Sequence, residues 1–181
     1  MFPARIKKGK NIMDKLIKEA KGGDPDAFAR LMRSHMQSMY KTAGAILFND
    51  EDIADAVSDT ILACWENLSG LKNNRFFKTW MTRILVNKCS DIIRRKKYFI
   101  GDELPDMPYT ENGYENAEWK EAIGQIPEKY RLVMLLYYIE GFNTGDISEI
   151  LDIPEGTVRS RLARGREYLA SEYAKKGGQT L

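Results

Sequence analysis

The stretch Asn143-Thr-Gly-Asp-Ile-Ser-Glu-Ile-Leu-Asp-Ile-Pro-Glu-Gly-Thr-Val-Arg-Ser-Arg-Leu162 decides the fold of the C-terminal part of the chain. Ser148 is a small residue at the point where two helices must cross, and Asp152 follows four residues later, where the chain must turn. Aspartate enters left-handed backbone geometry at modest cost, and Pro154 suits the first turn of a following helix. The apolar residues that would lock the second helix onto the first are Ile147, Ile150, Leu151, Ile153, Val158 and Leu162. The pattern predicts a helix-turn-helix from Asn143 to Leu169.

The second helix of this motif carries the side chains that we expect to contact DNA. They are Thr157, Arg159, Ser160, Arg161, Arg164 and Arg166. In a docked helix-turn-helix the first residues of the second helix meet base edges in the major groove, where arginine can bond guanine through two hydrogen bonds. The later arginines are better placed to hold phosphates. A purely structural helical hairpin is the alternative, but packing alone does not explain so many arginines on one short helix.

The rest of the chain also has a helical pattern, because apolar residues recur at spacings of three and four. Helices are expected near 12–21, 25–48, 76–98, 114–126, 128–140, 144–151 and 155–174, and a further one places Ile53, Val57, Ile61, Cys64 and Leu68 on one face. Asp24 can cap the helix that begins at Pro25. Residues 71–75, which contain two successive asparagines, are expected to form a loop. No useful length of strand-like alternation occurs, so the prediction is an all-α fold.

A change of composition divides the chain into two small helical domains. Residues 99–113 contain Pro105, Pro108, two glycines and several acids, and they have no helical period. This composition is typical of a flexible linker. We therefore expect one domain at 1–98, an acidic linker at 99–113 and a second domain, which holds the helix-turn-helix, at 114–181.

The distribution of charge supports this division. The formal net charge is only +2, but a basic block lies between Lys72 and Lys97, where Asp91 is the single acid. The balance inverts between Asp102 and Glu121, and the segment Arg159–Arg166 is basic again. Two basic blocks separated by an acidic one indicate two surfaces for polyanions and a connector that is not such a surface.

Several classes of protein are disfavoured by composition. The two cysteines, Cys64 and Cys89, form no C-x-x-C pair and the only histidine is His35, so no zinc site or other cofactor is expected. We expect both thiols to be buried and reduced, and His35 to lie on a helix face rather than to act as a base. No apolar run is long enough to span a membrane and no secretory signal begins the chain, so a cytoplasmic protein is expected. The sequence contains no acidic metal cluster and no nucleophile–base pair, so an enzyme that acts on nucleic acid is also disfavoured.

Two segments of the N-terminal part, taken together with the helix-turn-helix, carry a resemblance to a known family. They are Asp52-Ile-Ala-Asp-Ala-Val-Ser-Asp-Thr60 and Phe77-Lys-Thr-Trp-Met-Thr-Arg-Ile-Leu-Val-Asn-Lys-Cys-Ser-Asp-Ile-Ile-Arg-Arg95. The chain resembles the extracytoplasmic-function group of bacterial sigma factors, whose second region has the pattern F-x-x-W-L-x-x-I-(A/V)-x-N-x-x-x-D-x-x-R-(R/K). Residues 126–166 are similar to the fourth region of that family, and the resemblance spans about 24–169. Ser58 stands where the family commonly has glutamine.

The resemblance implies a promoter-specificity subunit of RNA polymerase. The residues that would dock on the β′ clamp of the core enzyme are Asp52, Asp55, Ser58, Asp59 and Thr60. Those that would engage the melted minus-10 element are Lys72, Asn73, Asn74, Arg75, Asn87, Asp91, Arg94 and Arg95. The C-terminal helix would read the minus-35 element as duplex, the C-terminal domain would contact the β flap, and the linker would resemble RNA in charge.

The resemblance further implies regulation by an anti-sigma factor, and no small-molecule substrate. Among the aromatic residues of the minus-10 region, helical spacing favours the core for Phe77 and Trp80, whereas Phe76 is more open. The alternative is a stand-alone helix-turn-helix regulator whose first domain senses a signal or dimerises.

Overall fold

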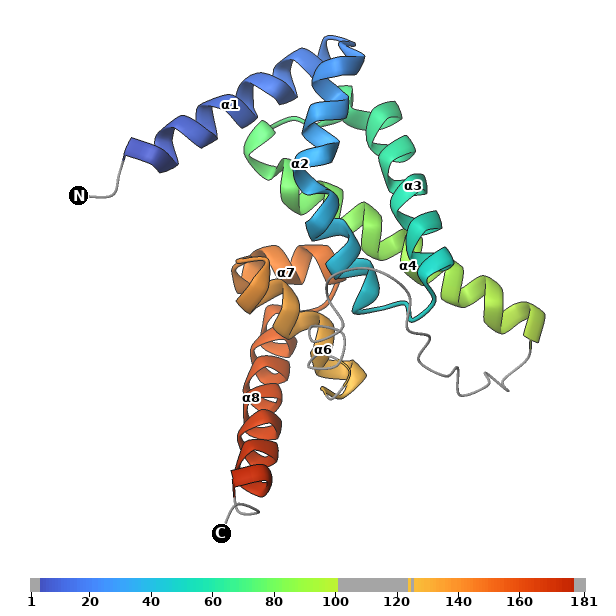
Figure 1. Ribbon diagram of the computed structural model, residues 1–181, viewed down its shortest axis with the longest axis vertical. Helices are drawn as coiled ribbons and strands as arrows, with labels where there is room; N and C mark the ends of the chain where they lie inside the picture. Colours follow the sequence, from blue (N-terminus) through green and yellow to red (C-terminus); the bar gives the residue numbers. More distant parts are fainter. Residues whose placement is uncertain (1–3, 101–123, 125, 178–181) are drawn as a thin grey trace.

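The computed structural model describes residues 4–100, 124 and 126–177, and within them every regular element is a helix (Figure 1). The all-α prediction is confirmed for this part of the chain. The structure has an N-terminal group of helices and a C-terminal group, which are described in turn below.

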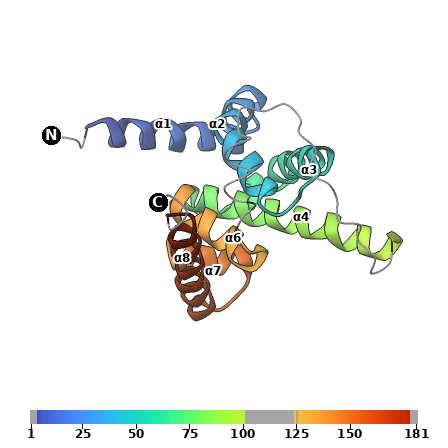
Figure 2. The ribbon, with the colours of Figure 1, turned by 60° about the horizontal axis from the view of Figure 1, so that its bottom comes forward.

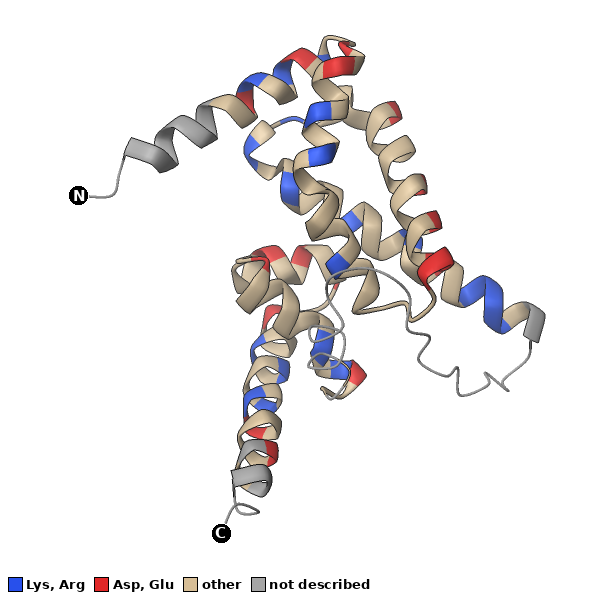
Figure 3. Cartoon of the chain, viewed as in Figure 1, with Lys and Arg blue, Asp and Glu red and all other residues tan. Residues whose placement is uncertain are grey.

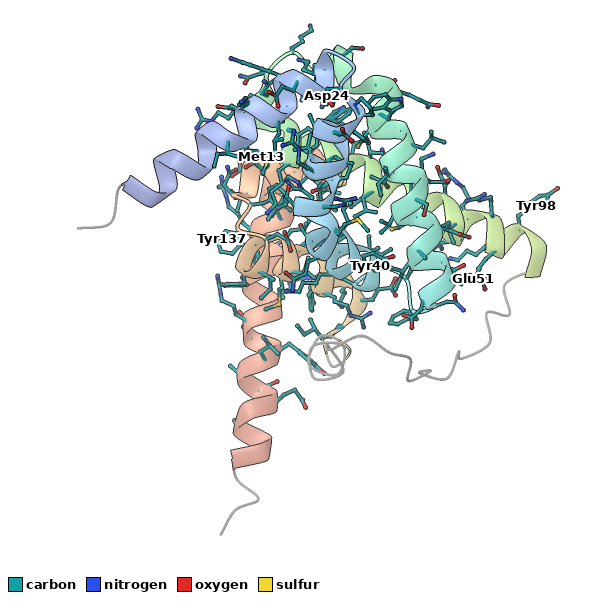
Figure 4. The ribbon with its side chains drawn as sticks, turned by 45° about the horizontal axis from the view of Figure 1, so that its top comes forward. Met13, Asp24, Tyr40, Glu51, Tyr98 and Tyr137 are labelled. Carbon is teal, nitrogen blue, oxygen red and sulfur yellow. The ribbon has the colours of Figure 1, made fainter. Side chains whose placement is uncertain are left out.

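The N-terminal group consists of α1 (Ala4–Lys21), α2 (Pro25–Gly44), α3 (Asp50–Asn67) and α4 (Phe77–Ile100), with short 3-10 turns η1 (Leu68–Gly70) and η2 (Asn74–Phe76) between the last two. The predicted cap of α2 is confirmed: Asp24 accepts hydrogen bonds from the backbone N–H groups of Asp26 at 2.9 Å and Ala27 at 3.1 Å, and it lies at the corner between α1 and α2 (Figure 4). Asn49 caps α3 in the same way.

One apolar core holds these helices together. Its most deeply buried members come from every main helix of the group and include Ile17, Leu31, Met39, Val57, Cys64, Phe77, Met81 and Leu85. The predicted inward face of the third helix is confirmed by Ile53, Val57, Cys64 and Leu68, which are all buried. The core fixes α4 against α2 and α3, so the outer face of α4 is presented on a rigid support.

The C-terminal group consists of α6 (Glu128–Met134), a π-helical turn η3 (Leu135–Ile139), α7 (Thr144–Leu151) and α8 (Glu155–Gly177). Its core is formed by Val133, Leu135, Leu136, Ile147, Ile150, Val158 and Leu162. This core includes most of the apolar residues that were predicted to pack the two helices of the motif against each other. The prediction of α7 is correct at both ends, and α8 runs three residues further than expected.

Other helix ends differ from the predictions. The expected helix 25–48 ends at Gly44, because Ala45 and Leu47 turn inward and are buried. The expected helix 128–140 widens into the π turn at Leu135, where the N–H of Glu140 bonds to the carbonyl five residues earlier. The helix α4 continues to Ile100, two residues into the segment expected to be linker. Most of that linker, and most of the helix expected at 114–126, lie outside the described residues, and the predicted bounds of the two domains stay a prediction.

The two groups of helices are in contact. The helices α4 and α7 pack against each other, and Figure 2 shows the C-terminal helices lying beneath α4. Two residues of the N-terminal group, Ala45 and Val86, are buried in the C-terminal core rather than in their own, with exposed fractions of 3% and 8%.

Candidate nucleic-acid and polymerase interfaces

The helix-turn-helix predicted from the sequence is present. The turn is made by Asp152, which is the only non-glycine residue with a positive φ among those described (φ 51°, ψ 47°). Its backbone N–H bonds to the carbonyl of Ser148. The Ser148 hydroxyl in turn donates to the carbonyl of Ile153 at 2.6 Å. Pro154 precedes α8 rather than entering its first turn, and its carbonyl accepts from the N–H groups of the first turn.

The helix α8 presents its basic side chains to solvent. Val158 and Leu162 face the core, with exposed fractions of 0% and 4%. The exposed members of the predicted DNA-contact set are Arg159, Ser160, Arg164 and Arg166, and Thr157 and Arg161 are half-buried. Figure 3 shows the basic residues spaced along the part of α8 nearest to α7. All six side chains therefore retain access to a ligand.

A short network joins the starts of α7 and α8. The Thr144 hydroxyl donates to Glu155 Oε1 at 2.5 Å, and Arg159 Nη2 donates to the same oxygen at 2.7 Å. These two hydrogen bonds, first that from Thr144 and then that from Arg159, lower the pKa of the Glu155 carboxyl below its ordinary value. The carboxylate therefore holds the guanidinium of Arg159 at the first turn of α8. The sequence-based DNA-contact set included neither Thr144 nor Glu155.

Arg166 has a different environment from the other arginines of α8. Its Nη1 donates to the Tyr138 hydroxyl at 3.2 Å, and this hydrogen bond raises the pKa of the guanidinium further above the neutral range. Tyr138 and Tyr137 pack edge to face with ring centroids 5.0 Å apart, and both are exposed. Arg166 is thus turned toward η3, away from the first turn of α8. This position suits a phosphate contact better than a base contact.

The segment before α4 lies at the surface, as predicted. Lys72, Asn73 and Arg75 are exposed, and Asn74 is half-buried. Asn73 accepts from the backbone N–H of Arg75 at 3.0 Å, so the expected loop contains the 3-10 turn η2. Lys21 of α1 donates to the Leu71 carbonyl and lies 3.4 Å from Asn74 Oδ1, which ties the segment to the first helix.

The aromatic residues of this region follow the prediction. Phe77 is buried at 2% exposure and Trp80 packs partly against the N-terminal core, whereas Phe76 is 47% exposed. On the outer face of α4, Asn87, Arg94 and Arg95 are exposed, and half-buried Asp91 pairs with Arg94. The exposed ring of Phe76 directly follows Asn74 and Arg75 of the predicted minus-10 set in the chain.

The predicted polymerase-binding residues of α3 comprise two exposed residues, two acids paired with lysines, and the buried Thr60. Asp55 and Ser58 are exposed. Asp52 and Asp59 are paired with lysines of α4, with Asp52 Oδ2 lying 2.5 Å from Lys96 Nζ and Asp59 Oδ2 lying 4.0 Å from Lys88 Nζ. These pairings reduce the charge that either acid offers to a partner.

Thr60 requires a correction. Its side chain is fully buried at 0% exposure, and its hydroxyl donates to the carbonyl of Ala56 at 2.6 Å. It therefore packs inside the domain and cannot reach polymerase. The sequence also missed two apolar side chains on α3, Leu62 and Trp65, which are 57% and 41% exposed. The available signal was that neither falls on the inward stripe of α3.

The two cysteines and the single histidine lie in the interior of the N-terminal group. Cys64 and Cys89 are free and buried, as predicted, and burial raises the pKa of each thiol to about 12. His35 is buried, with its Nδ1 3.0 Å from the Leu31 carbonyl and its ring 5.4 Å from that of Phe77. Within the described residues, no group of three or more His, Cys, Asp or Glu side chains could hold a metal ion. None of the helices in that part of the chain is long and apolar enough to span a bilayer.

Comparison with known proteins assigns both parts of the chain. The family Sigma-70 region 2 matches residues 31–98, and the family Sigma-70, region 4 matches residues 117–169. The extracytoplasmic-function RNA polymerase sigma factor SigW of Bacillus subtilis (strain 168) is 32% identical over 180 residues, which cover 89% of this chain and 96% of SigW. SigM of Mycobacterium tuberculosis (strain ATCC 25618 / H37Rv) is 29% identical over 152 residues, or 82% of this chain and 78% of SigM.

Solved structures agree on the fold. CnrH, in complex with the cytosolic domain of CnrY, has a TM-score of 0.68 and 24% identity, and the match covers 91% of this chain and 98% of CnrH. The sigma factor RpoE of Bartonella quintana, in complex with the anti-sigma factor NepR, has a TM-score of 0.66 and 20% identity, with coverage of 80% and 94%.

The helix-turn-helix domain and its helical N-terminal companion thus define a sigma-70-type transcription factor. The chain belongs to the extracytoplasmic-function sigma factors, which bind core RNA polymerase and direct promoter-specific initiation of transcription. The alternative of a stand-alone regulator is not favoured, because the match to region 2 occupies the N-terminal domain.

Proposed function

We propose that α8 reads the minus-35 element as duplex DNA, with Thr157, Arg159, Ser160 and Arg161 at base edges and Arg164 and Arg166 on phosphates. The observation that carries this proposal is the row of exposed basic side chains along α8, opposite the buried Val158 and Leu162. In a helix-turn-helix the first turns of the second helix meet the bases. The network from Thr144 through Glu155 holds Arg159 at that position.

The melted minus-10 element is bound by the segment Lys72–Phe76 and by the outer face of α4. Single-stranded nucleic acid is held by cationic grooves together with aromatic rings on which bases stack. Phe76 supplies the exposed ring, and Lys72, Arg75, Arg94 and Arg95 supply the exposed cations. Asn73, Asn74, Asn87 and Asp91 supply polar groups for base edges.

The polymerase interface lies on α3. It joins the exposed polar residues Asp55, Ser58 and Asp59 with the exposed apolar residues Leu62 and Trp65. Apolar and aromatic side chains at the centre of an interface commonly contribute most of its affinity. This α3 face therefore docks on the β′ clamp, while the C-terminal domain contacts the β flap.

The cellular setting follows from the same assignment. The protein works in the cytoplasm by binding, with no catalysis of its own. Solved relatives are complexes with the cytosolic domain of CnrY and with the anti-sigma factor NepR. An anti-sigma factor is accordingly the expected regulator of this chain as well.

Run-off transcription tests the proposal. Core polymerase plus this protein should initiate at a cognate promoter, and core polymerase alone should not. Replacing Arg159 and Arg161 with alanine should weaken use of the minus-35 element, by about 1–3 kcal/mol for each lost base contact. Unchanged promoter preference in that double variant would refute the assignment of base reading to α8.

A second set of variants tests the N-terminal domain. Substitutions at Lys72, Asn73 and Arg75 should change the preferred minus-10 sequence while leaving the affinity for core polymerase intact. A loss of core affinity in these variants would show that this segment contacts polymerase instead.

A further inference from the structure

Lys21 connects the first helix to the segment that we assign to the minus-10 element. Its Nζ donates to the backbone carbonyl of Leu71 and to Oδ1 of Asn74, the latter at 3.4 Å. These two acceptors bracket Lys72 and Asn73, which are both exposed. The match to Sigma-70 region 2 begins at residue 31 and does not include Lys21.

The position of Lys21 is fixed by the corner between α1 and α2. Gly23 has a φ of 89°, which favours glycine, and its N–H bonds to the Ala20 carbonyl at 3.0 Å. The N–H of Asp24 bonds to the Glu19 carbonyl at 3.2 Å, which completes the hydrogen-bond pattern of a Schellman motif at the end of α1. Because Asp24 also caps α2, Lys21 stands at a corner where hydrogen bonds fix both helix ends.

The inner face of α1 directs Lys21 toward the segment before α4. Ile17 and Ala20 are buried in the N-terminal core, and Lys21 follows Ile17 by four residues on the same side of the helix. The Lys21 side chain is half-buried, so its stem crosses the rim of this core while its ammonium reaches polar atoms of the segment. The helix α1 also packs against both η1 and η2 (Figure 1). The first helix therefore supports the segment 71–76.

The ammonium of Lys21 decides which group Asn74 can offer to a ligand. An ammonium carries only donors, so it must face the oxygen of the Asn74 amide. The Nδ2 of Asn74, which donates, then lies on the opposite branch of the amide. An asparagine held in this way is a donor of fixed direction, and it does not turn over to accept a hydrogen bond. Sequence is read through hydrogen bonds to base edges, so a fixed donor favours some bases over others.

We propose that Lys21 is a positioning residue for recognition of the minus-10 element. It fixes the backbone at Leu71 and the amide of Asn74, so that Asn74 donates to one base of the melted strand. This inference rests on the proposed function, in which residues 72–76 bind that strand. Lys21 acts through Asn74 and not as a phosphate contact. A phosphate contact adds similar affinity for every sequence, whereas a positioning residue changes the preference among sequences.

Selection from a randomised minus-10 element tests the inference with the complete holoenzyme. The probe is a promoter duplex whose minus-10 bases are unpaired and randomised, and the bound fraction is sequenced. Holoenzyme with the unmodified protein should enrich one base at the position that Asn74 reads. Lys21→Met keeps a long stem but removes the charge and the donors. It should lower that enrichment by about threefold to tenfold, as expected for the loss of one hydrogen bond.

Lys18→Met is the matched control, because Lys18 is an exposed lysine in the same last turn of α1. It should leave the enrichment unchanged. Neither variant should change the affinity for core polymerase or the preference at the minus-35 element. A uniform loss of DNA binding in Lys21→Met, with unchanged enrichment, would overturn the inference and assign Lys21 to a phosphate.

A double-mutant cycle shows whether Lys21 acts through Asn74. Asn74→Ala should lower the same enrichment, and adding Lys21→Met to Asn74→Ala should lower it no further. Additive losses, or no loss in Asn74→Ala, would overturn the inference. If circular dichroism shows that Lys21→Met does not fold, Lys21→Gln takes its place. This side chain is shorter and uncharged but still polar, and an unchanged enrichment in that variant would refute the role of Lys21.

Failure of the proposed function would give a different result in the same selection. Substitutions at Asn73 and Arg75 would then leave the minus-10 preference unchanged, because the segment would not bind the melted strand. If those substitutions change the preference and Lys21→Met does not, only the role of Lys21 is refuted.

Discussion

Asp152 forms the turn between α7 and α8 with its backbone in the left-handed region. Its position in the motif predicted a turn in left-handed geometry, and the structure has φ 51° there. Such geometry is strained for any residue with a Cβ atom and free of strain for glycine. Asp152→Gly should therefore raise the free energy of unfolding by about 0.5–1 kcal/mol, measured by urea denaturation.

The matching control is Asp152→Asn, which tolerates the same geometry and should change stability by less than about 0.5 kcal/mol. Asp152→Val should destabilise the protein, because a β-branched residue fits this region worst. If glycine were destabilising, the turn would depend on the aspartate side chain rather than on the backbone.

His35 gives the protein a predictable dependence on pH. Burial lowers its pKa below 6.5; Lys78 acts in the same direction, whereas the hydrogen bond to the Leu31 carbonyl and the charge of Glu140 oppose it. The unfolded chain thus takes up a proton at a higher pH than the folded chain does. Stability is complete above the unfolded pKa of about 6.5 and falls as the pH drops toward the lower folded pKa.

The urea midpoint should accordingly be lower at about pH 5.5 than at about pH 7.5. His35 is the only histidine in the sequence, so His35→Leu should remove most of this difference. An equally steep decline in the leucine variant would assign the effect to carboxyl groups.

Residue motifs identify positions without saying whether a side chain is accessible. The sequence placed Thr60 among polymerase contacts, but its hydroxyl bonds to the Ala56 carbonyl of its own helix and is buried. A polar residue that satisfies its hydrogen bond locally can lie in a core at little cost. Sequence alone cannot distinguish this case from an exposed threonine.

At the scale of elements, the exposed apolar residues of α3 call for a test. Trp65 is 41% exposed and packs edge to face with Phe28, their ring centroids 4.9 Å apart. If the α3 face docks on polymerase, Trp65→Ala should weaken core binding by about 2 kcal/mol, because tryptophans at interfaces are frequent hot spots. Fluorescence anisotropy with labelled protein would measure this affinity.

Leu62→Ala on the same face should have a smaller effect in the same direction. Tyr98→Ala removes an aromatic ring that is 86% exposed on α4 and should leave core affinity unchanged. Equal losses in all three variants would point to a general effect on folding instead of a local interface.

The start of α8 provides a second test at this scale. Glu155→Gln keeps an acceptor for Thr144 but removes the charge that holds Arg159. Discrimination between matched and mismatched minus-35 sequences should fall up to about tenfold, because one well-formed arginine–base contact is worth about 1–3 kcal/mol. Competition binding of holoenzyme to the two sequences measures this ratio.

Glu149→Gln removes the same charge from an exposed position of α7 and serves as the control. Both variants should bind all DNA more tightly, since an acid near phosphates has been lost, but only Glu155→Gln should lose discrimination. Equal ratios for the two would mean that Arg159 needs no support from Glu155.

Helical periodicity predicted where the elements lie better than where they end. The positions of α2, α4, α7 and α8 followed from apolar spacing and, for α2, from the capping residue Asp24. The early end of α2 did not, because Ala45 and Leu47 continue the apolar pattern while they are drawn into packing. Tertiary contacts, which a local pattern does not contain, decided that end.

At the scale of the whole molecule, the contact between domains could not be predicted. Lys78 and Glu140, which form an ion pair across it, lie 62 residues apart in sequence, and each resembles an ordinary surface charge in its own helix. Ala45 and Val86 fit the apolar pattern of the N-terminal domain, yet they are buried in the C-terminal core. Only the three-dimensional structure shows that the two proposed DNA-binding domains share an interface.

Both partners of that interface belong to one polypeptide, and this changes the strength that the interface needs. A tethered pair sees an effective concentration that can reach about 1 mM, so contacts too weak to join two separate proteins are still mostly formed. The occupancy of this interface between the domains is then the same at every cellular abundance of the protein. A competitor from solution, whether polymerase or a regulator, must overcome this local concentration. It can do so by binding both domains at once.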